Sequence, residues 1–473
     1  MPPPPTKRPD LTSVTTINRD GSHYILHPAD VRGLFTRYRR WFGLALLLIY
    51  VVLPWIPING FPAVFLDLDA RRFHLFGLTF LAQDLWLGFF AVSGLGFLLF
   101  YLTALFGRLW CGWACPYTVF LEQIFRRIER WVDGDAPARR KLEQAPWDGS
   151  KITKRVLKHG LFLLCATLIA HIFLAYFVSF KELYNFVRSS PLEHLQSFGI
   201  VVFVTLALYF AFAWFREQFC IILCPYGRIQ SALSDDNTVV IGYDEGRGEP
   251  RGKAKDSGRG DCIDCQRCVK VCPTGIDIRN GLQMECIGCA ACVDACDEIM
   301  LKLDRPKGLV RYDSMNGLAG QKTRFVRPRT IVYTMLMLVG AGALMFSLTR
   351  VHDVNVAVAR MRGSTFYVDE IGVRNQFEIS LTTKRNVETA FTLGIEGGPE
   401  GLRLGGMSEP IKVPRQGESK HAVILTIPRE NYEGSVTVQL VARSEPGGTV
   451  IRKDMRLIGP APYALDGSFD EKP

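Results

Sequence analysis

The chain lacks several features that define common protein classes, and these absences narrow what it can be. Its first apolar run follows some forty polar residues and lacks a small-residue cleavage site, so we expect no secretory signal. Residues 354–460 contain no cysteine, which excludes a disulfide or a thiolate site from that part of the chain. Lysine and arginine are scarce in residues 59–83 and 181–196, which carry two each. Short segments poor in these residues are typical of the outer side of a membrane protein.

The overall composition indicates a membrane protein. Of the 473 residues, 48% are hydrophobic and 22% are charged, a mixture typical of membrane spans that alternate with water-exposed segments. The formal net charge of +10 is consistent with the basic inner side of such a protein. We expect no nucleic-acid partner, because the basic residues lie beside apolar runs.

Five apolar runs are close to the ~20 residues that a helix needs to cross a bilayer. The segments between them alternate between rich and poor in lysine and arginine, and the loop at 107–158 carries eleven. The positive-inside rule then predicts that residues 1–40, this loop and the segment after the fourth run are cytoplasmic. The loops at 59–83 and 181–196, and everything after residue 350, are predicted to lie outside. The runs cover residues 41–58, 85–106, 159–180, 197–215 and 331–349.

The segment 262–296 carries the strongest chemical signal. Each half has the C-x2-C-x2-C-x3-C spacing of a bacterial two-cluster ferredoxin, in which the fourth cysteine of each run completes the other cluster. Zinc sites normally use paired C-x2-C elements, so zinc or a disulfide scaffold is the weaker interpretation. Cluster thiolates need a reducing compartment, so this segment should be cytoplasmic. The predicted ligands of the two 4Fe-4S clusters are Cys262, Cys265, Cys268 and Cys296 for the first, and Cys286, Cys289, Cys292 and Cys272 for the second.

Two matching C-x3-C-P motifs, at residues 110–117 and 220–227, form a second candidate site. Each lies just past the predicted cytoplasmic end of an apolar run, and cysteines four residues apart share one helix face. The two helices run in the same direction and can bring four thiols together. Soft thiolates favour Cu(I), zinc or a redox dithiol, and the spacing does not separate these roles; four buried cysteines without chemistry are the alternative. The predicted catalytic and metal-binding residues are Cys111, Cys115, Cys220 and Cys224.

The last quarter of the chain changes character. Apolar and polar residues alternate in 376–382, 422–427 and 435–441, and glycine, proline and asparagine separate these stretches. This pattern predicts a small antiparallel β-sandwich, which we interpret as a partner-docking or spacer module.

The chain resembles the FixG/RdxA/CcoG cytochrome c oxidase accessory proteins over nearly all of its length. The most specific stretches are residues 110–117, 216–229, 243–252 and 260–298. The resemblance implies a membrane anchor, a cytoplasmic dicluster domain and a C-terminal immunoglobulin-like domain. It also implies a role in assembling the cbb-type haem–copper oxidase. In that role Cu(II) is reduced to Cu(I) at or near the C-x3-C-P pairs and passes toward the oxidase's copper centre.

The patterns and the resemblance together predict a multi-domain, multi-pass protein of the bacterial inner membrane. We expect an α-helical bundle of five spans, an inserted α+β bacterial-type two-cluster ferredoxin domain and a C-terminal all-β immunoglobulin-like sandwich. The predicted boundaries are 1–40 for a cytoplasmic segment, 41–219 for spans one to four, 220–330 for the ferredoxin domain, 331–349 for the fifth span and 350–473 for a periplasmic sandwich.

The function expected from these features is that of a membrane-bound iron–sulfur cupric reductase with an assembly role. Its partners would be a cytoplasmic electron donor, the cbb-type oxidase assembly machinery, and copper chaperones or transporters. An electron-transfer protein of the quinol-dehydrogenase type, serving a periplasmic reductase, is the alternative. The sandwich and the segment 246–252 favour the accessory family over that alternative. A docking scaffold without catalysis is a third interpretation.

Overall fold

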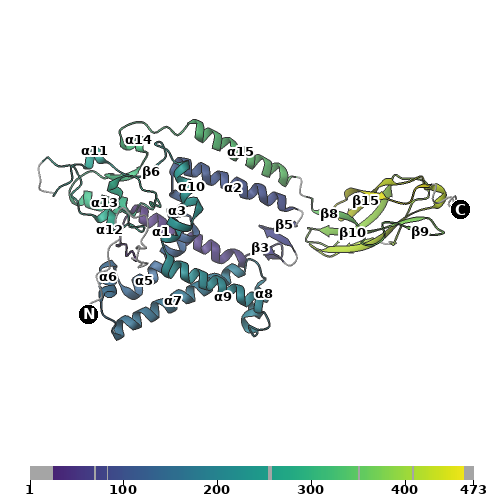
Figure 1. Ribbon diagram of the computed structural model, residues 1–473, viewed down its shortest axis with the longest axis horizontal. Helices are drawn as coiled ribbons and strands as arrows, with labels where there is room; N and C mark the ends of the chain where they lie inside the picture. The colour runs from purple at the N-terminus through teal and green to yellow at the C-terminus, as the bar shows by residue number, and fades with distance from the viewer. Residues whose placement is uncertain are drawn as a thin grey trace, which may run out of the picture. The chain divides into compact units, whose positions relative to one another are not determined.

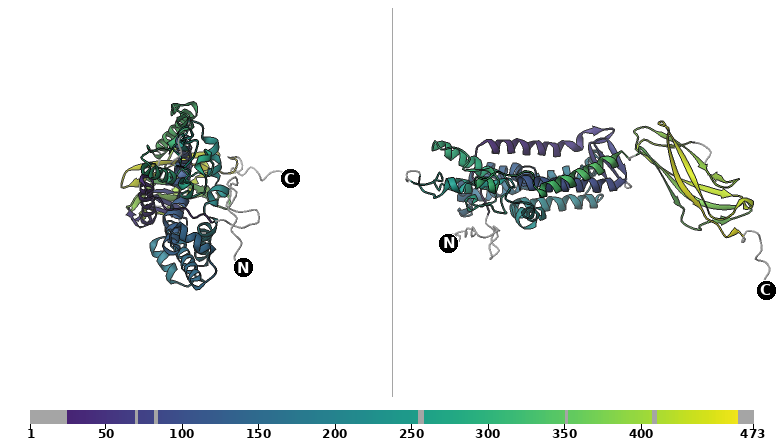
Figure 2. Two further views of the ribbon diagram at one scale, coloured as in Figure 1. Left: turned by 90° about the vertical axis from the view of Figure 1, so that its left-hand side faces the viewer. Right: turned by 90° about the horizontal axis from the view of Figure 1, so that it is seen from above.

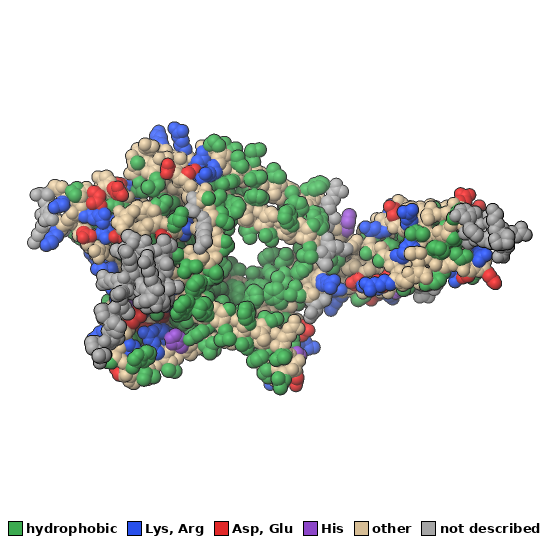
Figure 3. All heavy atoms as spheres, in the orientation of Figure 1, with side chains coloured by type: hydrophobic (Ala, Val, Ile, Leu, Met, Phe, Trp, Pro, Cys, Tyr) green, Lys and Arg blue, Asp and Glu red, His purple; other side chains and the backbone are tan. Residues whose placement is uncertain are grey.

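The longest apolar sequences form helices, as their length and hydropathy predict. The computed structural model describes residues 25–68, 71–81, 84–253, 258–349, 352–406 and 410–462, and within these ranges four helices are long and apolar enough to cross a membrane. Their side chains are mostly exposed, and Figure 3 shows hydrophobic side chains covering this region. A broad apolar surface of this kind is suited to lipid. The four helices are α2 (Leu85–Phe106), α7 (Gly149–Leu174), α9 (Leu195–Phe210, continued by a π turn to Phe215) and α15 (Pro328–Leu348).

The first predicted span is not among the four, so a five-span bundle is not confirmed. The run expected at 41–58 belongs instead to α1 (Leu34–Val52), whose first seven residues include three arginines. The helix ends before Pro54, because proline cannot continue the backbone ladder, and a 3-10 turn (Leu53–Trp55) follows. The chain then turns back in a small hairpin of β1 (Pro57–Ile58) and β2 (Phe61–Pro62).

The third span also differs from its predicted bounds of 159–180. It begins ten residues earlier, at Gly149, because the Asp148 carboxylate accepts a hydrogen bond from the backbone N–H of Lys151 at 2.7 Å and caps the helix. It ends at Leu174, and a separate helix α8 (Phe180–Arg188) follows. Helices α7 and α9 pack side by side (Figures 1 and 2). In the segment that connects α1 to α2 along the chain, strands β3 (Val64–Asp67) and β4 (Arg72–Leu75) pair with each other.

Short helices connect the long ones at the end where the ferredoxin segment lies. Between α2 and α7 the chain forms α3 (Leu109–Trp113), α4 (Pro116–Phe120), a π turn (Leu121–Phe125), α5 (Arg126–Asp133) and α6 (Ala136–Gln144). After α9, a π turn (Phe219–Leu223) leads into α10 (Pro225–Leu233). Each C-x3-C-P motif therefore lies in a short helix or turn directly after an apolar helix.

The ferredoxin segment is an α+β unit, as predicted. Strand β6 (Val240–Tyr243) pairs antiparallel with β7 (Val310–Asp313), and these strands enclose the cysteine-rich chain between them in sequence. That chain contains α11 (Glu245–Gly248), α12 (Arg267–Lys270), a 3-10 turn (Ile278–Asn280) and α13 (Ala291–Lys302), and α14 (Met315–Leu318) follows β7. The buried residues Ile241, Val293 and Met300 pack with Cys262 and Cys268 in one core. The cysteine loops are thus held between a sheet and a helix.

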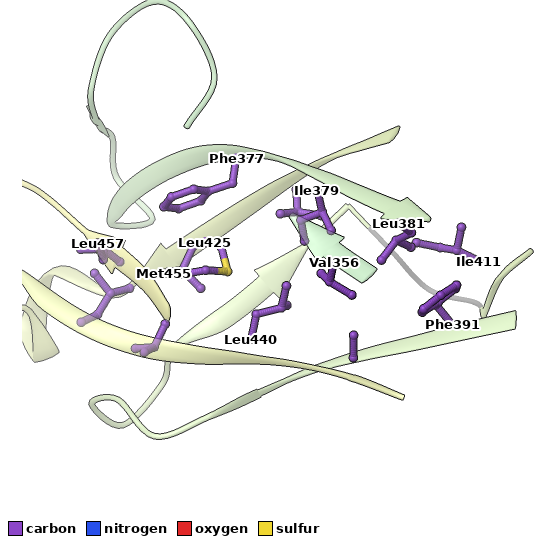
Figure 4. Close-up of a cluster of buried hydrophobic side chains, with 14 of the residues drawn as sticks. Val356, Phe377, Ile379, Leu381, Phe391, Ile411, Leu425, Leu440, Met455 and Leu457 are labelled. Atoms are coloured by element: carbon purple, nitrogen blue, oxygen red, sulfur yellow. The ribbon is translucent and has the colours of Figure 1, made fainter. Parts of the chain in front are cut away.

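The chain divides into two compact units, and the second is an all-β sandwich. The first unit is 1–76 with 85–346, and the second is 77–84 with 347–473. One antiparallel sheet has the order β12-β14-β10-β8, with β9 paired to β10, and the other has the order β13-β11-β15-β16. Ile379, Leu425, Leu440 and Met455 point into the space between the sheets (Figure 4), as the alternating sequence predicts. The short strand β5 (Leu78–Leu81) belongs to neither of these sheets. The strands of the sandwich are β8 (Val354–Arg360), β9 (Tyr367–Val368), β10 (Val373–Thr383), β11 (Thr389–Glu396), β12 (Arg403–Gly405), β13 (Ile411–Val413), β14 (Glu418–Ile427), β15 (Val436–Glu445) and β16 (Thr449–Leu457).

Candidate iron–sulfur and thiol site

The eight cysteines of the ferredoxin segment line two neighbouring cavities, one predicted set of four on each. The first cavity is lined by Cys262, Cys265, Cys268 and Cys296. The second is lined by Cys272, Cys286, Cys289 and Cys292, with Cys268 also on its wall. The fourth cysteine of each run therefore lies with the first three of the other run.

Left-handed turns curve the two loops around these cavities. Gln266 and Ala290 each follow the second cysteine of a run and have φ values of 54° and 59°. Each residue then caps the short helix that carries the third cysteine, α12 or α13. A non-glycine residue in this region costs about 1 kcal/mol or more, so the surrounding packing must hold it there. Ala290 is fully buried, which supplies that packing at the second loop.

The arrangement of the thiols fits a cluster and does not fit a single ion. Within the described ranges, no three His, Cys, Asp or Glu side chains are close enough to hold one metal ion. A single zinc would need four thiolates about 2.3 Å from one point, whereas these thiols are spread around a cavity. Burial raises the pKa of Cys268, Cys286 and Cys296 to about 12, so these thiols need bound iron to become thiolates near neutral pH.

The two C-x3-C-P motifs have matching local structures. Cys115 and Cys224 each precede a proline in the first turn of a short helix, and both have extended backbones, with ψ values of 122° and 112°. Cys111 lies in α3 and Cys220 in the π turn before α10. The proline keeps each second cysteine out of the helix, as expected from the sequence.

The four thiols of the two motifs lie close enough together to affect one another's pKa values. Burial, together with the nearby Cys115, Cys111 and Cys224, raises the pKa of Cys220 to about 12. Burial also raises the pKa of Cys111 to about 11, although Gln230 Nε2 donates a hydrogen bond to Cys111 Sγ at 3.5 Å. Because no three of the thiols chelate one ion in this conformation, a third ligand would require movement of a turn.

The first C-x3-C-P turn packs directly on the loop of the second cavity. A Cβ added to Gly112 would lie 2.5 Å from the carbonyl oxygen of Ile287 and 3.0 Å from the Cα of Cys289. Arg39 Nε donates a hydrogen bond to the Gly112 carbonyl at 2.9 Å. Tyr312 joins the two sides, because its hydroxyl donates to the Gly288 carbonyl at 2.6 Å and accepts from Trp113 Nε1 at 3.2 Å. The site residues of the two motif types are therefore neighbours.

A buried network of ion pairs surrounds this contact, and the sequence reasoning missed it. Arg216, which is 1% exposed, pairs with Glu129 and lies 3.6 Å from Glu217, which in turn lies 3.2 Å from Arg126. Arg126 Nη2 also donates to the carbonyl of Pro273 at 2.9 Å, next to Cys272. The available signal was the spacing of Glu122, Arg126 and Glu129, which places them on one helix face. Only the fold shows that this face is buried.

Family models match three stretches of the chain. A family model described as a 4Fe-4S dicluster domain matches residues 215–315, and one described as a 4Fe-4S binding domain matches 87–134. A third, an IG-like fold at the C-terminal of FixG, matches 344–460. The 87–134 match includes Cys111 and Cys115.

Curated relatives match most of the chain. Protein RdxA of Cereibacter sphaeroides is 36% identical over 80% of this chain and 83% of its own length. Nitrogen fixation protein FixG of Rhizobium meliloti is 33% identical over 91% of this chain and 90% of its own length. Protein RdxB of Cereibacter sphaeroides is 34% identical over 91% of this chain and 91% of its own length. The crystal structure of a FixG-related protein from Vibrio parahaemolyticus matches 23% of this chain and 97% of that one, at 18% identity and a TM-score of 0.21, and no conclusion rests on it.

The described helices, the cysteine cavities and these relatives point to one assignment. The four apolar helices make this a membrane protein, and the dicluster match supports iron–sulfur clusters as its cofactors. The chain therefore belongs to the FixG/RdxA family and is a membrane iron–sulfur electron-transfer protein.

Proposed function

We propose that this protein reduces Cu(II) to Cu(I) at the four C-x3-C-P cysteines. The observation that supports this most is the contact of Gly112 with Ile287 and Cys289, which leaves no room for a side chain between the thiol turn and the second cluster loop. Electron transfer between two sites requires such proximity. The 4Fe-4S clusters, when bound, supply single electrons, which is what the conversion of Cu(II) to Cu(I) consumes.

The thiols themselves favour the reduced product. Thiolates are soft ligands that select Cu(I), so binding at Cys111, Cys115, Cys220 and Cys224 stabilises Cu(I) over Cu(II). The burial that raises the pKa of Cys111 and Cys220 means that copper must displace their protons on binding. Copper binding should therefore tighten as the pH rises. Copper is here the substrate of the reaction.

The donor and the acceptor would approach from different sides. Cys265 on the first cavity is exposed, whereas Cys289 on the second is buried beneath the thiol turn. A cytoplasmic electron donor would dock near Cys265, and Cu(I) would leave toward the assembly machinery of a cbb-type oxidase, through copper chaperones or transporters. In this proposal the ferredoxin segment lies on the cytoplasmic side of a bacterial inner membrane and the sandwich lies in the periplasm.

The experiment compares two variants of the purified, cluster-loaded protein under anaerobic conditions. The quadruple variant with alanine at Cys111, Cys115, Cys220 and Cys224 should keep its iron and sulfide but lose nearly all reduction of Cu(II) by dithionite-reduced protein. The matched control is Cys165→Ala, which removes a half-buried thiol in α7 outside both sets. Unchanged copper reduction in the quadruple variant would refute this site. Cluster reduction in membranes that requires quinol would instead support the quinol-dehydrogenase alternative.

A further inference from the structure

A large basic groove lies beside the second cluster loop, and nothing in the proposed reaction uses it. Among the residues that the structure describes, the groove is lined by eight arginines and by two acidic residues, Asp30 and Glu122. Its wall comes from the start of α1, the segment before it, and the connection from the π turn to α6. Val271 and Pro273, which flank Cys272, also line it.

The positive charge of the groove is not balanced from within. Asp30 pairs with Arg130, and Glu122 pairs with Arg126 and lies 3.2 Å from Arg39. In the part of the chain that the structure describes, Arg32, Arg37 and Arg40 form no ion pair, and all three are exposed. An anion is therefore the ligand that this surface attracts.

The groove continues into an apolar surface. Trp41 and Trp131 line it with exposed fractions of 66% and 78%. Beyond Trp41, helix α1 presents exposed Leu44, Leu48 and Ile49. Leu48 lies eight residues after Arg40, which is about 12 Å along a helix axis. Basic residues, then tryptophan, then exposed aliphatic side chains follow the order of headgroup, interface and acyl chains in a bilayer.

We propose that this groove binds an anionic glycerophospholipid, with the phosphate among Arg32, Arg37 and Arg40 and the acyl chains along α1. An acidic protein would also be attracted to the arginines, but its charged surface would not cover the apolar face that continues from them. The lipid also accounts for the three arginines at the start of α1, which are suited to the headgroup layer. The proposal does not depend on copper reduction.

The test measures lipid retention by the full-length, cluster-loaded protein in detergent with native mass spectrometry. We expect dioleoyl phosphatidylglycerol to be retained at least tenfold more strongly than dioleoyl phosphatidylcholine. The variant R32Q/R37Q/R40Q should lose this preference, because each arginine removed should weaken the retention of phosphatidylglycerol about fivefold. Millimolar glycerol 3-phosphate should not displace the lipid, because it lacks the acyl chains.

The matched control is K181Q/R188Q, which removes two exposed basic residues from α8 outside the groove. It should change retention less than twofold, and all variants should keep their iron content. Raising the salt concentration should weaken phosphatidylglycerol retention by the unaltered protein, which tests the charge without any substitution. Equal retention of the two lipids, an unaffected triple variant, or displacement by glycerol 3-phosphate would each overturn the proposal.

Discussion

At the scale of single residues, the absence of a side chain at Gly112 lets the two chemical sites come into contact. Gly112 directly follows the first cysteine of the first C-x3-C-P motif, and it touches the loop that carries Cys286 and Cys289. The atoms it meets are backbone atoms, which cannot move aside as the end of a flexible side chain can. The motif therefore needs glycine here for a reason that its cysteine spacing does not show.

Replacing Gly112 with alanine should push the thiol turn away from the second cluster loop. We expect the rate of Cu(II) reduction to fall at least tenfold, because electron transfer weakens steeply with distance, while the first cluster stays in place. Stopped-flow kinetics and EPR of the reduced clusters measure these two effects. The control is Gly160→Ala in α7, where an added Cβ meets nothing within 4 Å. A Gly112→Ala variant with unaltered kinetics would show that the contact is not the route.

At the scale of elements, α5 and the turn after α9 are held together by buried charges rather than by apolar packing alone. Glu129 in α5 is 3% exposed and accepts a hydrogen bond from Arg216 Nη2 at 3.3 Å. Burial alone would raise the pKa of Glu129, but the guanidinium of Arg216 lowers it to about 2. Removing one partner of such a pair leaves the other charge buried and uncompensated.

The variant Glu129→Gln should lose about 3–5 kcal/mol of unfolding free energy at pH 7. In the unaltered protein the carboxylate contributes stability above the unfolded pKa of about 4.3, and this contribution is lost as the pH falls toward 2. The variant should lack that part of the pH dependence. Denaturant unfolding in detergent, followed by tryptophan fluorescence at several pH values, measures both. The control Glu298→Gln removes an exposed ion pair with Lys302 and should cost under about 1 kcal/mol; an equal cost for both variants would contradict the argument.

At the scale of the whole molecule, the two units have separate cores. The sandwich buries a continuous apolar cluster from Val354 to Leu457 and contains no cysteine, whereas the first unit contains every cysteine of the chain. Stability of the sandwich therefore rests on packing between its sheets. We expect the ferredoxin segment to gain much of its stability from its clusters when they are bound.

The variant Leu425→Ala in the full-length protein should destabilise the sandwich by about 2–5 kcal/mol, because Leu425 is fully buried between the sheets. Iron content and copper reduction should not change. Limited proteolysis of the sandwich, read beside the visible absorbance of the clusters, separates the two outcomes. Val450→Ala, at a site 40% exposed on β16, is the control and should have little effect. Loss of the clusters in Leu425→Ala would show that the units are coupled.

Much of this protein could be predicted from its sequence, because the features concerned are local. Hydropathy predicted five membrane spans, and four of them are helices long and apolar enough to cross a membrane. Alternation predicted the sandwich, and the spacing of Cys262–Cys296 indicated the clusters, which the dicluster match supports. Each of these signals depends on residues that lie close together along the chain. The assignment of individual cysteines to copper stays a prediction.

Only the tertiary structure decided how the distant motifs meet. The apolar run at 41–58 predicted a membrane span, but the structure places part of it in α1, whose arginines belong to a groove formed with residues some ninety positions away. The contact of Gly112 with the 287–289 loop and the pairing of Glu129 with Arg216 join segments that no local pattern relates. The spacing of residues along the chain shows which of them share a helix face or a loop. The packing of the whole first unit determines which of these faces are buried against each other.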